Sequence, residues 1–266
     1  MDFPNVPVSE GSEDGVSAGP VPDRAAPPAP REAVLVVMAK APRPGEVKTR
    51  LVPPLRPEDA AALHRCCVLD TLENVSRLDG VDVALAYWPP DAEAEFDRLW
   101  SGEGGGLRFP QAGRDLGERM LTCFRRAFDA GYRCAALHGT DIPLASAGEL
   151  ARGFERLRRD SADLVLGPTD DGGYYFIGAR AVHPGLFEGI RWSAPGVLES
   201  TRRRAEALGL RTAKIARARD LDTPEDLRAL RDAFARPGFQ KGKTSLHPHP
   251  APRTREFLMN LPGEIR

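Results

Sequence analysis

The sequence contains little cysteine, and its spacing matches neither a zinc site nor a disulfide framework. The four cysteines are Cys66, Cys67, Cys123 and Cys134. The first two are adjacent in a segment with a helical pattern, so their side chains point in different directions. We therefore expect reduced, structural thiols and a cytoplasmic protein.

The sequence also lacks a long apolar run, an excess of charge of one sign, and an N-terminal stretch that resembles a signal peptide. The longest apolar run, residues 33–39, is far shorter than the roughly 20 residues that cross a membrane as a helix. The formal net charge of −1 gives no general reason to expect nucleic acid or an anionic membrane as a partner. The first residues lack the basic and apolar regions of a signal peptide. We expect no membrane span and no nucleic-acid partner.

Composition divides the chain into one domain and two tails. Residues 1–30 contain almost no large apolar side chains, so they cannot bury enough surface to offset the entropy of ordering, and we expect a disordered tail. Residues 236–266 are basic and rich in proline and histidine. A short apolar patch at 257–261 could dock elsewhere on the protein, but we expect a solvated tail. The range 31–235 is predicted to be a single α/β domain.

Strand and helix patterns alternate through this domain. Strand patterns lie at 33–39, 81–87, 107–109, 134–137, 163–166, 174–177 and 211–215, and helical patterns at 57–78, 91–100, from 115, 147–159, 194–208 and from 222. Such alternation predicts a mostly parallel sheet with helices on both faces.

The first strand pattern leads into a cationic loop at residues 40–50. Its prolines and glycine exclude a helix or a central strand there. Its cations are Lys40, Arg43, Lys48 and Arg50. Because ligands of open α/β sheets bind beyond the carboxyl ends of the strands, this loop favours a polyphosphate ligand. A solvated basic loop is the alternative.

This loop is not a P-loop. That motif needs glycine six positions and one position before its lysine, and Pro42 and Val47 occupy those places before Lys48. The prolines also remove backbone N–H donors, so phosphate binding would depend on side-chain charges.

Two separate aspartates are candidates for a metal site. Asp141 ends a strand pattern and Asp222 precedes the last helix, and carboxylate oxygens suit Mg²⁺ when a nucleotide supplies further ligands. Each also has a structural interpretation, Asp141 as a turn cap and Asp222 in the favourable field of a helix N-terminus. Arg119, one turn into the helix from 115, is either a ligand contact or a surface arginine.

A cluster of acids, glycines and tyrosines joins the strand patterns at 163–166 and 174–177. The two acids, Asp170 and Asp171, could bind metal, accept a hydroxyl group or act as a base. Gly172 and Gly173 permit close backbone approach to a ligand, and Tyr174 follows them. A tight Asp-Gly hairpin is the alternative.

Five sequence blocks together resemble one known family. They are M-A-K-A-P-R-P-G-E-V-K-T-R-L, D-L-G-E-R-M, G-T-D-I-P, G-P-T-D-D-G-G-Y-Y-F-I-G and D-L-D-T-P-E-D-L, within about residues 33–232. In this order they are similar to the GT-A-fold glycosyltransferases associated with radical-SAM and selenodomain proteins, the arsenosugar-biosynthesis type. More distantly, the first loop and the D-T-P-E-D-L block resemble guanylyl- and cytidylyltransferases, including phospholactate guanylyltransferase and the molybdenum-cofactor nucleotidyltransferases.

The resemblance implies a GT-A-type sheet with Lys48 and Arg50 near donor phosphates. It also implies Asp141 as the metal aspartate and Asp222 as a second one, as in the nucleotidyltransferase relatives. The sequence departs from the family in two places. An acid of the D-x-D motif is missing, since Thr140 precedes Asp141 and Ile142 and Pro143 follow it, and Leu144 replaces an acidic or polar residue.

The expected function is transfer from a nucleotide-activated donor with Mg²⁺ or Mn²⁺. Glycosyl transfer from a nucleotide-sugar to a small acceptor is the first choice, with a carboxylate near Asp171 taking the acceptor's proton. The alternatives are nucleotidyl transfer from an NTP with release of pyrophosphate, and non-catalytic nucleotide binding.

Overall fold

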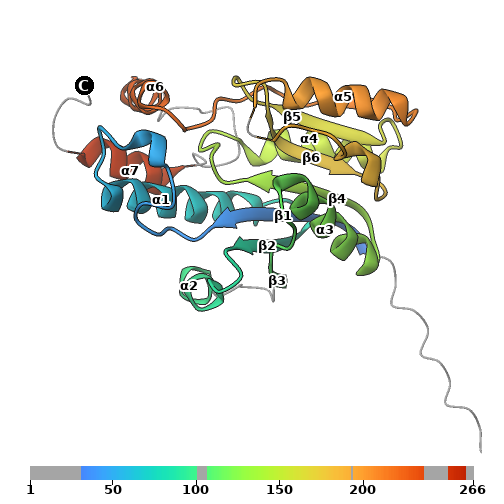
Figure 1. Cartoon of the computed structure of the whole chain (residues 1–266), viewed down its shortest axis with the longest axis horizontal. Coiled ribbons are helices and arrows are strands. Elements are labelled where there is room, and N and C mark those ends of the chain that lie inside the picture. The colour runs from blue at the N-terminus through green and yellow to red at the C-terminus, as the bar shows by residue number, and fades with distance from the viewer. Residues whose placement is uncertain (1–30, 101–106, 193, 237–250, 262–266) are drawn as a thin grey trace, which may run out of the picture.

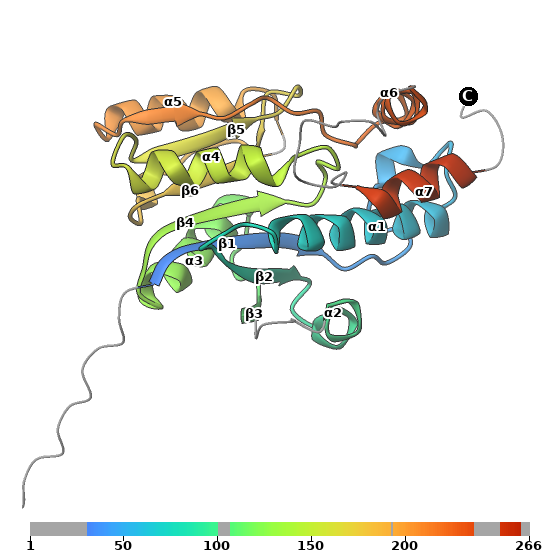
Figure 2. The same ribbon diagram turned by 180° about the vertical axis from the view of Figure 1, so that it is seen from behind.

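The domain is built on a twisted, mostly parallel sheet (Figures 1 and 2). The computed structural model describes residues 31–100, 107–192, 194–236 and 251–261, so the expected disordered tail at 1–30 lies outside the described residues. Within them, seven strands follow the order β3-β2-β1-β4-β6-β5-β7. They are β1 Arg31–Lys40, β2 Asp82–Trp88, β3 Leu107–Pro110, β4 Tyr132–Gly139, β5 Leu164–Pro168, β6 Tyr174–Ala179 and β7 Thr212–Lys214.

Helices cover both faces of the sheet, as the alternating pattern predicts. They are α1 Pro57–Val75, α2 Glu93–Leu99, α3 Leu116–Asp129, α4 Ala147–Arg158, α5 Val197–Ala207, α6 Pro224–Ala235 and α7 Pro252–Asn260. The helices α1 and α4 pack on one face, in front of the sheet in Figure 2, and α3 and α5 pack on the other. None of the described helices has the length and apolar character needed to cross a membrane.

The strand β1 is buried on both faces because successive side chains of a strand point to opposite sides. Leu35 and Val37 enter the core beneath α1 and α4, while Val34 and Val36 enter the core beneath α3 and α5. The strand therefore contributes side chains to both cores, and this packing positions its last residue, Lys40.

The carboxyl edge of the sheet collects segments that are distant in sequence. Strands β1 and β4 are parallel neighbours with Met38 opposite Gly139, so the segments after both strands leave at this edge. Strand β6 is antiparallel to β4 and β5, so its first residue, Tyr174, meets the same edge. The N–H of Leu221 donates to the carbonyl of Asp141 at 2.9 Å, which ties the start of α6 to the end of β4.

The sequence-based expectation of a solvated tail after residue 236 is wrong for α7. Leu258 of this helix is fully buried in a third apolar cluster with residues of α1 and α6. The buried carboxylate of Asp70 in α1 accepts hydrogen bonds from the backbone N–H groups of Arg253 at 3.2 Å and Thr254 at 2.8 Å. The helix thus receives its N-terminal cap from α1, because its own N-cap residue, Ala251, offers no side-chain acceptor.

Candidate active site

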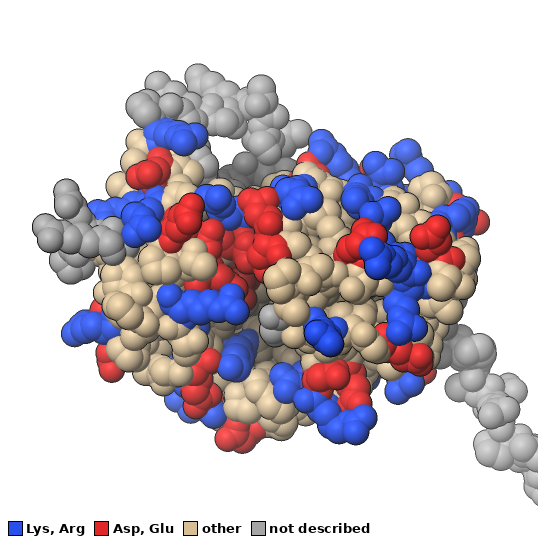
Figure 3. All heavy atoms as spheres, turned by 45° about the horizontal axis from the view of Figure 1, so that its top comes forward, with Lys and Arg blue, Asp and Glu red and all other residues tan. Residues whose placement is uncertain are grey.

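A cavity of about 710 Å³ opens at the carboxyl edge of the sheet. In the space-filling view, acidic side chains gather along one rim of the hollow and basic side chains lie across from them (Figure 3). The loop after β1, the segment after β4, the β5–β6 hairpin and the segment before α6 all contribute to its lining. The structure thus brings together, at one place, most of the side chains that the sequence nominates.

Lys48 lies at the centre of a group of charged side chains in the cavity. Its ammonium group contacts the carboxylate of Asp141 and lies 3.2 Å from that of Asp222. It also donates to the carbonyl of Leu221 at 2.6 Å. The backbone of Lys48 adopts the left-handed conformation, with φ 49°, a strained state for a residue with a side chain and one that clusters at functional sites. Two carboxylates from different elements therefore converge on one cation position.

The charges at this position reinforce each other. Burial lowers the pKa of Lys48, since its side chain is only 3% exposed, but the attraction of Asp141 and Asp222 outweighs this effect and raises that pKa overall. Burial likewise raises the pKa of Asp141, and the charge of Lys48 more than reverses the effect, so that this pKa is lowered overall. Lys48 and Asp141 are therefore both ionised at neutral pH.

Two of the other three cations of the loop line the same cavity as Lys48. Arg50 is 3.8 Å from Asp222, and Lys40 donates to the carbonyl of Glu46 at 2.8 Å; both line the cavity. Arg43 does not line the cavity, because its guanidinium group is paired with Glu95 and Asp91 near α2.

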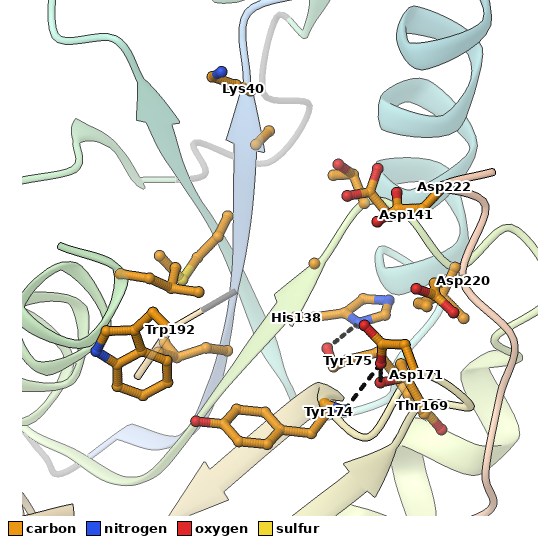
Figure 4. Close-up of a pocket in the computed structure, with 18 of the residues that line it drawn as sticks. Lys40, His138, Asp141, Thr169, Asp171, Tyr174, Tyr175, Trp192, Asp220 and Asp222 are labelled. Atoms are coloured by element: carbon orange, nitrogen blue, oxygen red, sulfur yellow. Dashed lines mark hydrogen bonds between the residues drawn. The ribbon is translucent and has the colours of Figure 1, made fainter. Parts of the chain in front are cut away.

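The β5–β6 hairpin places its two acids differently. Asp171 lines the cavity, and its Oδ1 accepts hydrogen bonds from the Thr169 hydroxyl at 2.5 Å and the Gly173 N–H at 2.9 Å (Figure 4). Asp170 is not part of the lining and lies 3.6 Å from Arg219. Of the two predicted catalytic acids, Asp171 alone faces the cavity among the described residues.

The remaining hairpin residues support this arrangement. Gly172 has φ 89°, where glycine alone is free of strain, and its carbonyl accepts from the N–H of Leu198 at 3.0 Å. Gly173 and Tyr174 line the cavity. Gly172 therefore shapes the turn, while its two successors form the wall.

Arg119 also lines the cavity, as a candidate ligand contact. Its guanidinium carbon lies 3.6 Å over the ring of Trp88, and its Nε donates to the carbonyl of Gly113 at 3.3 Å. No carboxylate of the described residues pairs with it, so its charge is available to an anion in the cavity.

Sequence reasoning missed Asp220, which lines the cavity beside Asp171 and Asp222 (Figure 4). Desolvation, followed by repulsion from Asp171, raises the pKa of Asp220 to about 6. The signal was available: Asp220 and Asp222 are two residues apart in an extended segment, a spacing that points both side chains to one side. Trp192 and His138 were also missed, because nothing in their local sequence links them to the edge.

The comparisons with known proteins agree on the fold. The family described as "Uncharacterized protein conserved in bacteria (DUF2064)" matches residues 71–194. A solved structure described as a "putative nucleotide-diphospho-sugar transferase" from Desulfovibrio desulfuricans G20 is 32% identical, covers 85% of this chain and 94% of its own, and superposes with a TM-score of 0.74. The chain belongs to the DUF2064 family.

More distant solved structures share the fold alone. A 4-diphosphocytidyl-2C-methyl-D-erythritol synthase from Anaerococcus prevotii DSM 20548 has 13% identity over 77% of this chain and 97% of its own, with a TM-score of 0.54. A CMP:2-keto-3-deoxy-manno-octonic acid synthetase complexed with CTP has 14% identity over 77% and 98%, with a TM-score of 0.50. No curated protein matches the chain. The predicted nucleotide-diphospho-sugar transferase fold of GT-A type is confirmed.

The carboxylates fit a divalent cation that arrives with a nucleotide. Asp141 and Asp222 already share a cation, the ammonium of Lys48, and their side chains are 47% and 34% exposed, which leaves oxygen surface open to the cavity. The described residues contain no group of three or more histidine, cysteine or acidic side chains arranged to hold a metal. Two carboxylates plus phosphate oxygens and water are a typical Mg²⁺ environment.

Proposed function

We propose that the protein transfers a group from a nucleotide-activated donor to a small acceptor. The observation that carries this proposal is the convergence of Asp141 and Asp222 on one cation position, beside a cationic loop at the carboxyl edge of the sheet. Lys40, Lys48 and Arg50 would hold the donor phosphates, and Arg119 would contact a second anionic group. A polyphosphate with a divalent cation is the ligand whose charges match this arrangement, since the phosphates pair with the cations and the metal pairs with the aspartates.

Glycosyl transfer is our first choice of reaction. The free Oδ2 of Asp171 would accept the proton of the acceptor hydroxyl, whose oxygen would attack the anomeric carbon of the donor sugar as the bond to the nucleoside diphosphate breaks. The relative from D. desulfuricans is itself described as a "putative nucleotide-diphospho-sugar transferase". The sequence blocks further support a place in the radical-SAM-associated, arsenosugar-type group of the family.

The proposed cofactor is Mg²⁺ or Mn²⁺, held by Asp141 and Asp222. When bound, it would offset the negative charge that develops on the leaving nucleotide. Lys48, bound to both carboxylates, would keep them in position before the nucleotide arrives and would then be available to its phosphates.

Nucleotidyl transfer is the second candidate, and the same pair of aspartates favours it. A site in which Asp141 and Asp222 act as equal ligands resembles the nucleotidyltransferase relatives more than a single-aspartate glycosyltransferase. In that reaction a phosphate oxygen of the acceptor would attack the α-phosphorus of an NTP, and pyrophosphate would leave.

Isothermal titration with nucleoside diphosphates, with and without Mn²⁺, tests the proposal. We expect Mn²⁺ to tighten nucleotide binding by at least about tenfold in the wild type, because the metal bridges protein and phosphate. Asp141→Asn and Asp222→Asn should both lose this coupling, since each removes one full charge next to the metal. Asp163→Asn is the matched control, because Asp163 pairs with Arg211 away from the cavity.

Three outcomes separate the candidates. Release of a nucleoside diphosphate from nucleotide-sugars indicates glycosyl transfer, and release of pyrophosphate from NTPs indicates nucleotidyl transfer. Metal-coupled binding without either product indicates a nucleotide-binding protein. Absence of nucleotide binding by the wild type, or coupling that survives in both aspartate variants, contradicts the proposal.

A further inference from the structure

The cavity has two halves of different chemistry. The charged half, next to α1, contains Lys48, Asp141 and Asp222. The other half, next to α3 and the start of α5, is lined by Met38, Met120, Leu137, Ile177, Tyr174 and Trp192. Arg119 of α3 also lines the cavity, where its guanidinium group lies over the ring of Trp88. In Figure 4, the ring of Trp192 and the side chain of Tyr174 lie on the opposite side from the labelled aspartates. We call this second region the apolar half.

The apolar half is shaped by a specific contact. The ring of Trp192 packs directly on Gly117 of α3, where an added Cβ would lie 2.5 Å from the indole. Any other residue at 117 would push the ring away, so glycine is what allows the wall to close. At the rim, Leu116, the first residue of α3, lines the cavity although its surface is 43% exposed. An apolar wall that extends to an exposed leucine indicates a ligand with apolar surface.

We propose that the apolar half binds the acceptor, and that the acceptor is an apolar molecule carrying its hydroxyl group at one end. This inference rests on the proposed function, in which the charges of the donor occupy the other half. Asp171, the proposed base, belongs to the same hairpin as Tyr174, so the reactive hydroxyl lies where the apolar half begins. A polyol would leave several hydroxyl groups without partners against methionine, leucine and isoleucine, which is costly.

The test uses N-phenyl-1-naphthylamine, an uncharged probe whose fluorescence rises in apolar sites. We expect saturable binding to the full-length protein, retained in the presence of saturating nucleotide and Mn²⁺. Leu116→Ser should weaken probe binding about fivefold, the effect of removing a half-buried leucine side chain from the contact. Leu208→Ser is the matched control, because Leu208 is 46% exposed and does not line the cavity.

Competition defines the class of acceptor. Cyclohexanol and myo-inositol share a six-carbon ring and differ in the number of hydroxyl groups. We expect cyclohexanol to displace the probe at concentrations where inositol does not. Trp192→Ala should abolish the displacement of the probe by cyclohexanol. A melting curve shows whether the Trp192→Ala protein is folded. If it is not folded, Leu116→Ser remains informative, because Leu116 is an exposed residue.

Contrary results fall into two groups. Equal displacement by inositol, equal effects of Leu116→Ser and Leu208→Ser, or displacement of the probe by nucleotide alone would overturn this inference and leave the proposed function intact. The last of these would assign the apolar half to the nucleobase. Probe binding of the expected kind in a protein that binds no nucleotide would overturn the proposed function, and with it the assignment of this half to an acceptor.

Discussion

Lys48 shows how far a single residue can differ from its sequence context. The loop that carries it is rich in proline, glycine and charge, which predicts solvent exposure, yet its side chain is 3% exposed and lies between two carboxylates. The local sequence cannot show this, because Asp141 and Asp222 lie 93 and 174 positions later in the chain. The identity of the cation was predictable, but its partners were not.

Replacing Lys48 should therefore affect stability as well as binding. We expect Lys48→Met to lower the free energy of unfolding by about 2 kcal/mol in metal-free buffer, less than for a fully buried pair because both aspartates are partly exposed. Added Mn²⁺ should restore part of this loss by replacing the missing positive charge. The measurement is urea unfolding with and without metal.

Arg50→Met is the control for this experiment. Its side chain is 67% exposed and 3.8 Å from Asp222, so its loss should change the free energy of unfolding by less than about 0.5 kcal/mol. Equal effects of the two substitutions would show that Lys48 is not a structural partner of the aspartates.

His138 predicts a pH dependence of stability. Burial lowers the pKa of this histidine to about 4, and one ring nitrogen, Nδ1, donates to the carbonyl of Tyr175 at 3.0 Å. An unfolded histidine titrates near 6.5, so the unfolded state binds more protons between pH 6.5 and 4. His138 therefore contributes its full stability above pH 6.5, and this contribution falls by about 3 kcal/mol as the pH drops to 4.

A His138→Asn variant isolates this contribution. The asparagine Nδ2, like the histidine Nδ1, is bonded to Cγ and can donate to the Tyr175 carbonyl, but asparagine does not titrate. The unfolding free energy of the wild type, relative to that of the variant, should therefore fall by about 3 kcal/mol as the pH drops from 6.5 to 4. The comparison between proteins is needed because Asp220, whose pKa is raised to about 6, changes stability in the opposite direction within this window. A difference that stays constant with pH would contradict the prediction.

At the scale of elements, α7 is the part of the fold that depends most on a distant partner. Asp70 is 1% exposed and accepts the backbone N–H groups of Arg253 and Thr254. We expect Asp70→Ala to lower the free energy of unfolding by about 2 kcal/mol, the loss of a buried cap. Glu73→Ala, which removes a more exposed partner of Arg253, should cost less than about 0.5 kcal/mol. Thermal melting of the two variants measures both losses of stability. Equal losses for Asp70→Ala and Glu73→Ala would mean that the cap contributes little.

Most elements could be predicted from the sequence because their boundaries are marked locally. Thr223 and Pro224 predict the start of α6, and the structure has a capping box from Thr223 to Asp226 with Pro224 at the first turn. Helix α7 has no such cap of its own. Its apolar patch at 257–261 was visible, but the surface that covers it belongs to α1 and α6, and nothing in the patch itself identified it as a docked helix.

At the scale of the whole molecule, the site depends on the sheet order rather than on net charge. The formal net charge is −1, yet acidic side chains gather along one rim of the hollow at the carboxyl edge, and basic side chains lie across from them (Figure 3). Parallel strands were predictable and place β1 and β4 at this edge. The reversal of β6, which adds Asp171 and Tyr174, follows from a hairpin between β5 and β6 whose direction the strand patterns alone did not determine.

The contact between α1 and α7 also sets an order of events during synthesis. Asp70 and Thr254 are 184 positions apart, and at translation rates of about 5–20 residues per second this separation corresponds to roughly 10–40 seconds. By the end of that interval the ribosome has synthesised every strand of the sheet. Throughout it, the face of α1 that receives Leu258 stays uncovered by α7 and is open to chaperones.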